Sequence, residues 1–176
     1  MKILYFFLTI ILLSSCGKVL FQVPQPEKAE RIVKIPQNLW GFYLSEDDTL
    51  IFAENSFQYR SSLSIMQKLD FDLRNEEVIL KMSNNKYYLN LKSKEDNLSA
   101  WMLFRFEKKG RELDIRYIES LDSLNLKLNS KDSFNLYNNL KIIEKDKEQI
   151  YTLKPVDFNV IDKLFDNSKR KVFIKD

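Results

Sequence analysis

Between Leu39 and Tyr117 the chain alternates apolar and polar side chains with a period of two, and turn-forming residues interrupt it at roughly ten-residue intervals. Residues 78–82 and 87–91 show the pattern on either side of Asn84-Asn85, a pair typical of tight turns. Successive side chains of a β-strand point to opposite faces, so the period predicts strands joined as antiparallel hairpins. The expected strands are 39–43, 49–53, 56–60, 77–82, 87–91, 101–107 and 113–117.

The pattern changes near the C-terminus. After an expected strand at 150–153, apolar residues recur at helical spacing, and Pro155 suits the first turn of a helix. The apolar stripe consists of Phe158, Ile161, Leu164 and Phe165. A closing strand is expected at 172–174, whereas residues 119–145 fit helical and strand spacing alike. We therefore expect a mainly β fold, an antiparallel meander forming a small barrel or a sandwich, with one C-terminal amphipathic helix.

Composition excludes several classes of protein. Hydrophobic residues make up 44% of the chain and aromatic residues 13%, which excludes a disordered chain. The absence of histidine excludes Ser-His-Asp and Cys-His catalysis and histidine-ligated zinc. The three glycines lie far apart, which excludes a glycine-rich phosphate loop. A formal net charge of +3 gives no indication of a nucleic-acid partner.

The first residues have the pattern of a secretory signal. Lys2 precedes an apolar run from Ile3 to Leu13, interrupted only by Thr9. As a helix this run would rise about 16 Å, well short of the ~30 Å hydrocarbon core of a bilayer. It therefore fits a cleaved leader better than a permanent membrane span.

The sequence Leu13-Ser14-Ser15-Cys16 that follows resembles the lipobox of bacterial lipoprotein precursors. The resemblance implies cleavage of residues 1–15 and acylation of Cys16, which would anchor the chain in a lipid bilayer. Gly17 after the cysteine implies the outer membrane, with the periplasmic or surface face left open. An ordinary leader followed by an unmodified cysteine is the alternative.

Three parts of the chain are expected: the leader 1–15, a lipidated tether 16–36 and a single β-rich domain 37–176. The tether is inferred from prolines at positions 24, 26 and 36 among polar residues, which favour an extended linker. The alternative is that residues 31–35 already form an edge strand.

The meander with a late helix resembles small lipocalin-like barrels, several of which are bacterial lipoproteins. A barrel of this size either fills with side chains or holds one small apolar ligand. Four aromatic residues in or beside expected strands are the candidates for lining such a cavity: Trp40, Phe42, Tyr87 and Trp101. The alternative is that these side chains form the core.

Charged residues give no distinctive chemical motif. The acidic turn 46–48 lacks the spaced pattern of a calcium loop, and Asp70 with Asp72 does not define a catalytic pair, so no metal, cofactor or catalytic residue is predicted. The turn and the basic run 169–171 are interpreted as solvated surface. Thr49 and Ser123, each between an aspartate and a leucine, resemble acceptors of periplasmic O-glycosylation.

These observations favour an envelope lipoprotein that acts by non-enzymatic binding, either of an envelope protein or of a small apolar ligand. The alternatives are a passive structural or assembly lipoprotein and, last, a carboxylate-dependent hydrolase.

Overall fold

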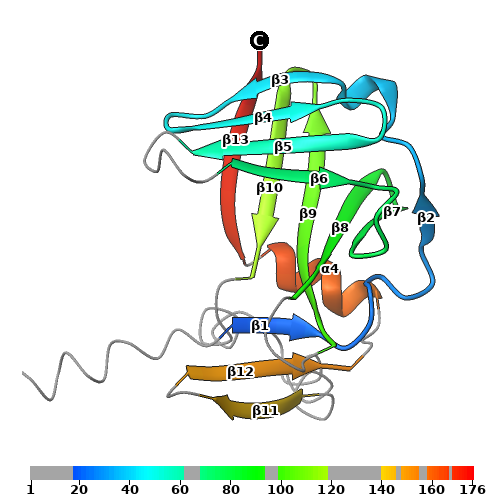
Figure 1. Cartoon of the computed structure of the whole chain (residues 1–176), viewed down its shortest axis with the longest axis vertical. Helices are drawn as coiled ribbons and strands as arrows, with labels where there is room; N and C mark the ends of the chain where they lie inside the picture. Colours follow the sequence, from blue (N-terminus) through cyan, green and yellow to red (C-terminus); the bar gives the residue numbers. More distant parts are fainter. Residues whose placement is uncertain are drawn as a thin grey trace, which may run out of the picture.

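Thirteen strands in the described part of the chain hydrogen-bond into one sheet, which curls into a half-barrel of mainly antiparallel strands (Figure 1). The computed structural model describes residues 18–61, 68–93, 99–118, 140–145, 148–154, 158–166 and 168–176. Within them the single α-helix is α4, near the C-terminus. The expected mainly β fold with one late helix is thus confirmed.

The strands are β1 Lys18–Phe21, β2 Glu30–Ile32, β3 Gly41–Leu44, β4 Asp48–Phe52, β5 Ser56–Ser61, β6 Lys68–Asp72, β7 Val78–Ser83, β8 Lys86–Lys92, β9 Trp101–Lys109, β10 Glu112–Tyr117, β11 Leu140–Lys145, β12 Glu148–Leu153 and β13 Lys169–Lys175. A 3-10 turn, η1, covers Gln37–Leu39, and α4 covers Phe158–Asp166. Asn84 and Asn85 both have positive φ angles, 50° and 59°, as the tight hairpin turn between β7 and β8 requires.

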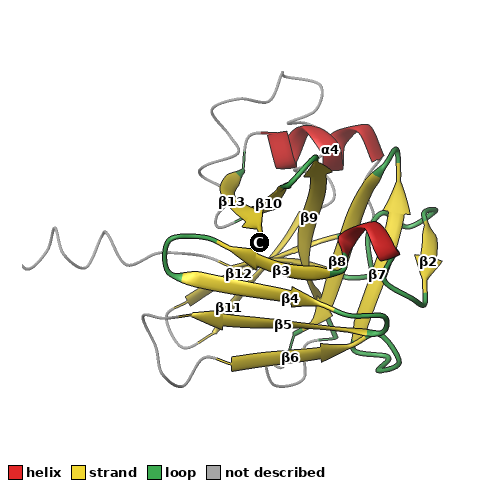
Figure 2. Cartoon of the chain, turned by 90° about the horizontal axis from the view of Figure 1, so that it is seen from above, coloured by secondary structure: helices red, strands yellow, loops and turns green. Residues whose placement is uncertain are grey.

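Strands β3 to β6 form a layer that runs across a second layer built from β7, β8, β9, β10 and β13 (Figures 1 and 2). The layers join where β13 pairs with β3 over only two residue pairs, Ile174 with Leu44 and Lys175 with Tyr43. This short corner lets the sheet turn sharply, so the two layers face each other across a shared interior.

The β8–β9 pair separates two apolar cores. Leu89 and Phe106 point into the half-barrel, where they pack in the larger core. Tyr88 and Leu103 point the other way and pack with α4, β1 and β12 in a second core. Because β-strands alternate faces, each of these two strands supplies both cores.

The expected tether at 16–36 is wrong over its described part. Strand β1 pairs in parallel with β12, and its residues Val19, Leu20 and Phe21 are buried. The proline-containing loop that follows is also held to the sheet, because the Lys81 ammonium donates hydrogen bonds to the carbonyl oxygens of Pro24, Pro26 and Glu27. An apolar triplet and a fixed loop therefore make this stretch part of the folded domain.

The alternative edge strand at 31–35 is confirmed in part, since β2 pairs with β7 from Glu30 to Ile32. Of the ambiguous stretch 119–145, residues 140–145 form β11. The rest of that stretch, including Ser123, lies outside the described residues, as do the leader 1–15, Cys16 and Gly17. No helix among the described residues is long and apolar enough to cross a membrane.

Candidate ligand site

A cavity of about 960 Å³ lies between the two layers of the half-barrel. Its wall is mainly apolar and comes from both layers, with Leu50 on β4, Leu91 on β8 and Ile115 on β10. Seven aromatic side chains also line it: Phe57, Tyr59, Phe71, Phe104, Phe106, Tyr117 and Phe173. Strands of distant sequence therefore converge on one apolar space.

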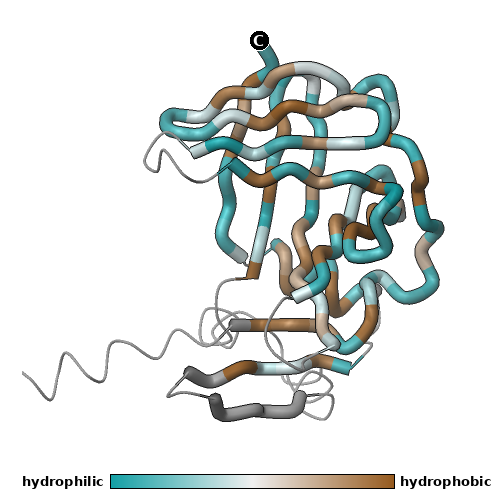
Figure 3. The backbone as a smooth tube through the Cα atoms, in the orientation of Figure 1, coloured by the Kyte–Doolittle hydropathy of each residue, from teal (hydrophilic) through white to brown (hydrophobic). Residues whose placement is uncertain are grey.

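Strand register explains why these side chains meet. In the layer that contains β9 and β10, Phe106 lies opposite Ile115 and Phe104 lies opposite Tyr117. All four side chains therefore occupy one face of the β9–β10 pair. The edge between β5 and β6 is covered by Phe57 stacked on Phe71, with ring centroids 4.6 Å apart and planes inclined by 19°. Figure 3 shows the hydrophilic turns of the β3–β6 layer and the hydrophobic run along β4 between them.

Part of the cavity wall lies at β6, which among the described strands pairs with β5 alone. Two apolar side chains that line the cavity are also exposed: Leu69 of β6 by 48% and Met102 of β9 by 37%. Large apolar side chains exposed at a cavity rim are typical of ligand entrances.

A polar cluster of Asp48, Tyr59 and Lys171 forms part of the cavity wall. The Tyr59 hydroxyl donates a hydrogen bond of 2.8 Å to Oδ2 of Asp48, and the Lys171 ammonium forms an ion pair with the same oxygen. The Asp48 side chain is only 3% exposed, whereas that of Lys171 is 38% exposed. A buried carboxylate is thus matched by a cation that reaches toward solvent.

The cluster shifts the titration of its members. Burial raises the pKa of Asp48, but hydrogen bonds from Lys171, Tyr59 and Ser61 outweigh burial and hold this pKa below its usual value. Burial, and then the hydrogen bond to the Asp48 carboxylate, raises the pKa of Tyr59 to about 12. Asp48 is therefore ionised and Tyr59 protonated at neutral pH.

None of the four predicted aromatic residues lines this cavity. Tyr87 is buried in the larger core, and Trp40 lies after η1, where its indole N–H donates to the carbonyl oxygen of Ile35 at 2.8 Å. Phe42 points outward from β3 and is 55% exposed. Trp101 is buried and has the parity of Leu103 in β9, so it points to the face opposite the cavity.

Most of the aromatic lining residues lie in expected strands, but Phe71 belongs to β6, a strand that the sequence pattern did not predict. The alternation alone also does not say which face of a strand points inward. The interpretation of the acidic turn as solvated surface is wrong for Asp48, and its partner Lys171 of the basic run is 38% exposed. They pair across the fold although 123 residues separate them in the chain. The alternation along each strand is visible in the sequence, whereas this long-range pairing is not.

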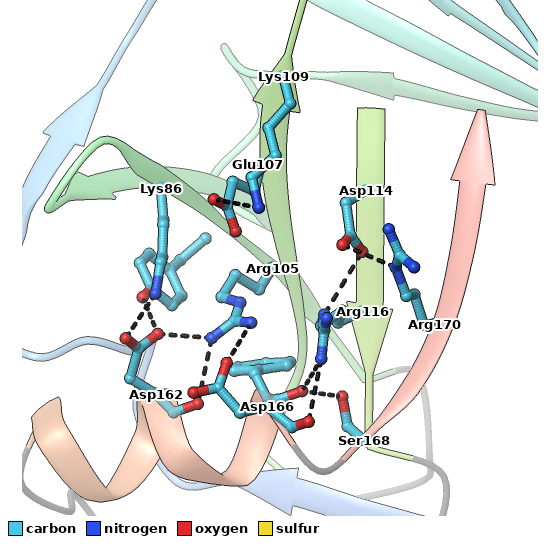
Figure 4. A network of polar contacts seen from close by, with 12 residues as sticks. Lys86, Arg105, Glu107, Lys109, Asp114, Arg116, Asp162, Asp166, Ser168 and Arg170 are labelled. Atoms are coloured by element: carbon cyan, nitrogen blue, oxygen red, sulfur yellow. Dashed lines mark hydrogen bonds and ion pairs between the residues drawn. The ribbon is translucent and has the colours of Figure 1, made fainter. Parts of the chain in front are cut away.

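The opposite face of the β8–β9 pair is filled by α4 and a network of charges (Figure 4). The Arg105 side chain, 2% exposed, donates to Oδ1 of Asp162 at 2.6 Å and to Oδ1 of Asp166 at 2.8 Å. Lys86 reaches the other oxygen of Asp162 at 2.6 Å, and the Tyr88 hydroxyl donates to Oδ1 at 3.1 Å. The network fixes the helix on the sheet.

Comparison with known proteins adds no assignment: no family model, no curated protein and no solved structure matches this chain. Among the residues that the structure describes, no group of three or more carboxylates or thiols is arranged to hold a metal ion.

Proposed function

We propose that this protein binds a small apolar molecule in the cavity between its two β layers. The observation that carries the proposal is a cavity of about 960 Å³ with a mainly apolar wall that includes the polar cluster of Asp48, Tyr59 and Lys171. Ligand sites in proteins measure ~300–1,000 Å³ and combine an apolar wall with a few fixed polar groups. We assign the cluster a positioning role in binding rather than a catalytic one.

We further propose that the chain is an outer-membrane lipoprotein, anchored through Cys16 in the bilayer. The lipobox-like Leu13-Ser14-Ser15-Cys16 supports this proposal. Because β1 begins at Lys18, acylation of Cys16 would hold the folded domain directly at the membrane surface. Substituting Cys16→Ser should release the protein from membranes, and unchanged membrane fractionation would contradict the anchor.

Binding is tested with Nile red, whose fluorescence rises in apolar surroundings, added to the purified full chain. Phe104→Trp adds bulk inside the cavity and should weaken binding by at least about tenfold, equivalent to ~1.4 kcal/mol. Phe42→Trp makes the same chemical change at a site 55% exposed on the outer face and should leave binding unchanged. Absence of Nile red binding, or equal effects of the two variants, would contradict the proposal.

A second candidate function is binding of an envelope protein through the outer face of β3 and β13. Phe42, Leu44 and Ile174 are exposed there by 55%, 47% and 45%, and Leu44 lies directly opposite Ile174. Apolar side chains grouped on a surface favour protein contacts. If this function holds, Phe42→Asp should abolish retention of an envelope protein by the tagged chain, while Val33→Asp, at a separate exposed site, should not.

A further inference from the structure

Charged residues of both signs surround the cavity. Five of them line it, namely Asp48, Asp70, Glu77, Lys92 and Lys171. Their arrangement determines which end group a bound molecule can carry, because a charge taken out of water requires a free counter-charge.

The deepest pair is Asp48 with Lys171. Oδ2 of Asp48 accepts hydrogen bonds from both Lys171 and Tyr59, so the carboxylate is already satisfied within the fold. Lys171 carries three N–H donors, of which this contact uses one. Since its side chain is 38% exposed, the cluster offers hydrogen-bond donors without offering net charge.

The charges at the rim are balanced in sign. Oδ2 of Asp70 lies 3.0 Å from Nζ of Lys68, its neighbour on β6. Glu77 directly precedes β7, and Lys92 is the last residue of β8. The Lys92 backbone N–H donates to the Glu77 carbonyl oxygen at 2.9 Å. The side chains of Glu77 and Lys92 are exposed and form no ion pair with each other, so the rim carries charges of both signs that stay in contact with water.

We infer, building on the proposed function, that the ligand is a long-chain molecule with an uncharged polar end, such as a hydroxyl, ester or amide. Its apolar chain occupies the aromatic interior, and its polar end accepts a hydrogen bond from Lys171. At the Asp48–Lys171 cluster a carboxylate end would meet the Asp48 carboxylate, and a cationic end would meet the Lys171 ammonium. Either end would lose hydration there without gaining a free counter-ion, because Asp48 and Lys171 already pair with each other.

The test is displacement of Nile red from the full chain by three amphiphiles of equal chain length below their micellar concentrations. These are uncharged monolauroylglycerol, anionic laurate and cationic dodecyltrimethylammonium. Monolauroylglycerol should displace the dye at a concentration at least about tenfold lower than either charged probe. Laurate binding as tightly as monolauroylglycerol, or more tightly, would overturn the inference and leave the proposed function intact. Failure of Nile red itself to bind would remove the proposed function and the inference together.

Charge variants sharpen the test. Asp48→Asn leaves the Lys171 charge free and should raise laurate affinity relative to monolauroylglycerol, whereas Asp70→Asn, at a rim side chain 55% exposed, should change the ratio much less. If Asp48→Asn prevents folding, Lys171→Gln serves instead, because its side chain reaches solvent. That variant leaves the Asp48 carboxylate unmatched and should raise the affinity for dodecyltrimethylammonium. An unchanged order of affinities in a folded variant would overturn the inference.

Discussion

The two faces of the β8–β9 pair are covered in opposite ways. On one face α4 packs Ile161, Leu164 and Phe165 against the strands, all 0% exposed. On the other face the β3–β6 layer crosses over the same strands and leaves about 960 Å³ between them. Strand alternation decides which side chains face each way, but the covering element decides whether a face becomes solid core or cavity.

The polar groups of the two faces differ in how far they are shielded from solvent. Arg105 on the helix face binds two carboxylates of one helix and is almost fully shielded from solvent. Asp48 on the cavity side is equally buried, but its partner Lys171 remains accessible. A closed network contributes to stability, and an open cluster retains donors for a ligand.

Removing the Arg105 side chain should have the largest effect on stability. Arg105→Ala leaves Asp162 and Asp166 without their shared cation, and loss of one partner of a buried pair costs about 3 kcal/mol. Denaturant unfolding of the full chain measures this loss. Arg74→Ala is the control, because Arg74 pairs with Asp72 on the surface, and it should unfold like the wild type. Equal stability of the two variants would contradict a structural role for the helix network.

Truncation of an apolar side chain should lower the unfolding free energy more on the helix face than on the cavity face, and by less than removal of Arg105. Leu164→Ala opens a void in a fully packed core and should cost about 2 kcal/mol of unfolding free energy. Met102→Ala shortens a side chain that is 37% exposed at the cavity rim and should cost less than about 1 kcal/mol. Comparable losses in the two variants would mean that the cavity face is as tightly packed as the helix face.

Acid should weaken the helix face through Asp162. Burial raises the pKa of Asp162, but Lys86 and Arg105 outweigh burial and hold this pKa below its usual value. A lowered carboxyl pKa stabilises the fold above the unfolded value of ~4, and that contribution is lost as the pH falls through the folded pKa. Unfolding free energies of wild type and Asp162→Asn should therefore converge as the pH falls below about 4. A difference that stays constant would contradict the network.

Raising the pH should lower stability through Tyr59 on the cavity side, and this is the smallest of the expected effects. The pKa of Tyr59 is raised from 10.0 to about 12, so its contribution to stability is present below pH 10.0 and is lost as the pH rises toward 12. An absorbance titration of tyrosinate should lose one late-titrating group in Tyr59→Phe. If the group missing from the titration of Tyr59→Phe is one with an ordinary tyrosine pKa of about 10, the hydrogen bond from Tyr59 to Asp48 is contradicted.

Much of the fold could be predicted from local sequence. The strands around Asn84-Asn85 and the stripe that forms α4 were correctly placed, because hairpin turns and amphipathic periodicity are short-range signals. Strand β1 was missed because its burial depends on pairing with β12, more than a hundred residues away in the chain. An apolar triplet beside prolines does not reveal such a partner.

The candidate site was predicted less well for a related reason. Sequence indicated an aromatic-lined interior, yet Trp101 and Phe42 point away from it while Phe104 and Phe106 line it. Choosing the inward face requires knowing which element covers each side of β9, and that is tertiary information. The pairing of Asp48 with Lys171 depends on the β13–β3 corner in the same way.

The most direct test of the cavity is a methyl NMR titration of the full chain with Nile red. Methyl groups of Leu91, Met102 and Ile115 report on the cavity, and those of Ile161 and Leu164 report on the helix face. We expect the first group to shift in a saturable way while the second stays in place. Shifts that spread equally over both groups, or no shift at saturating dye, would contradict a ligand cavity on one face of β8–β9 and a solid core on the other.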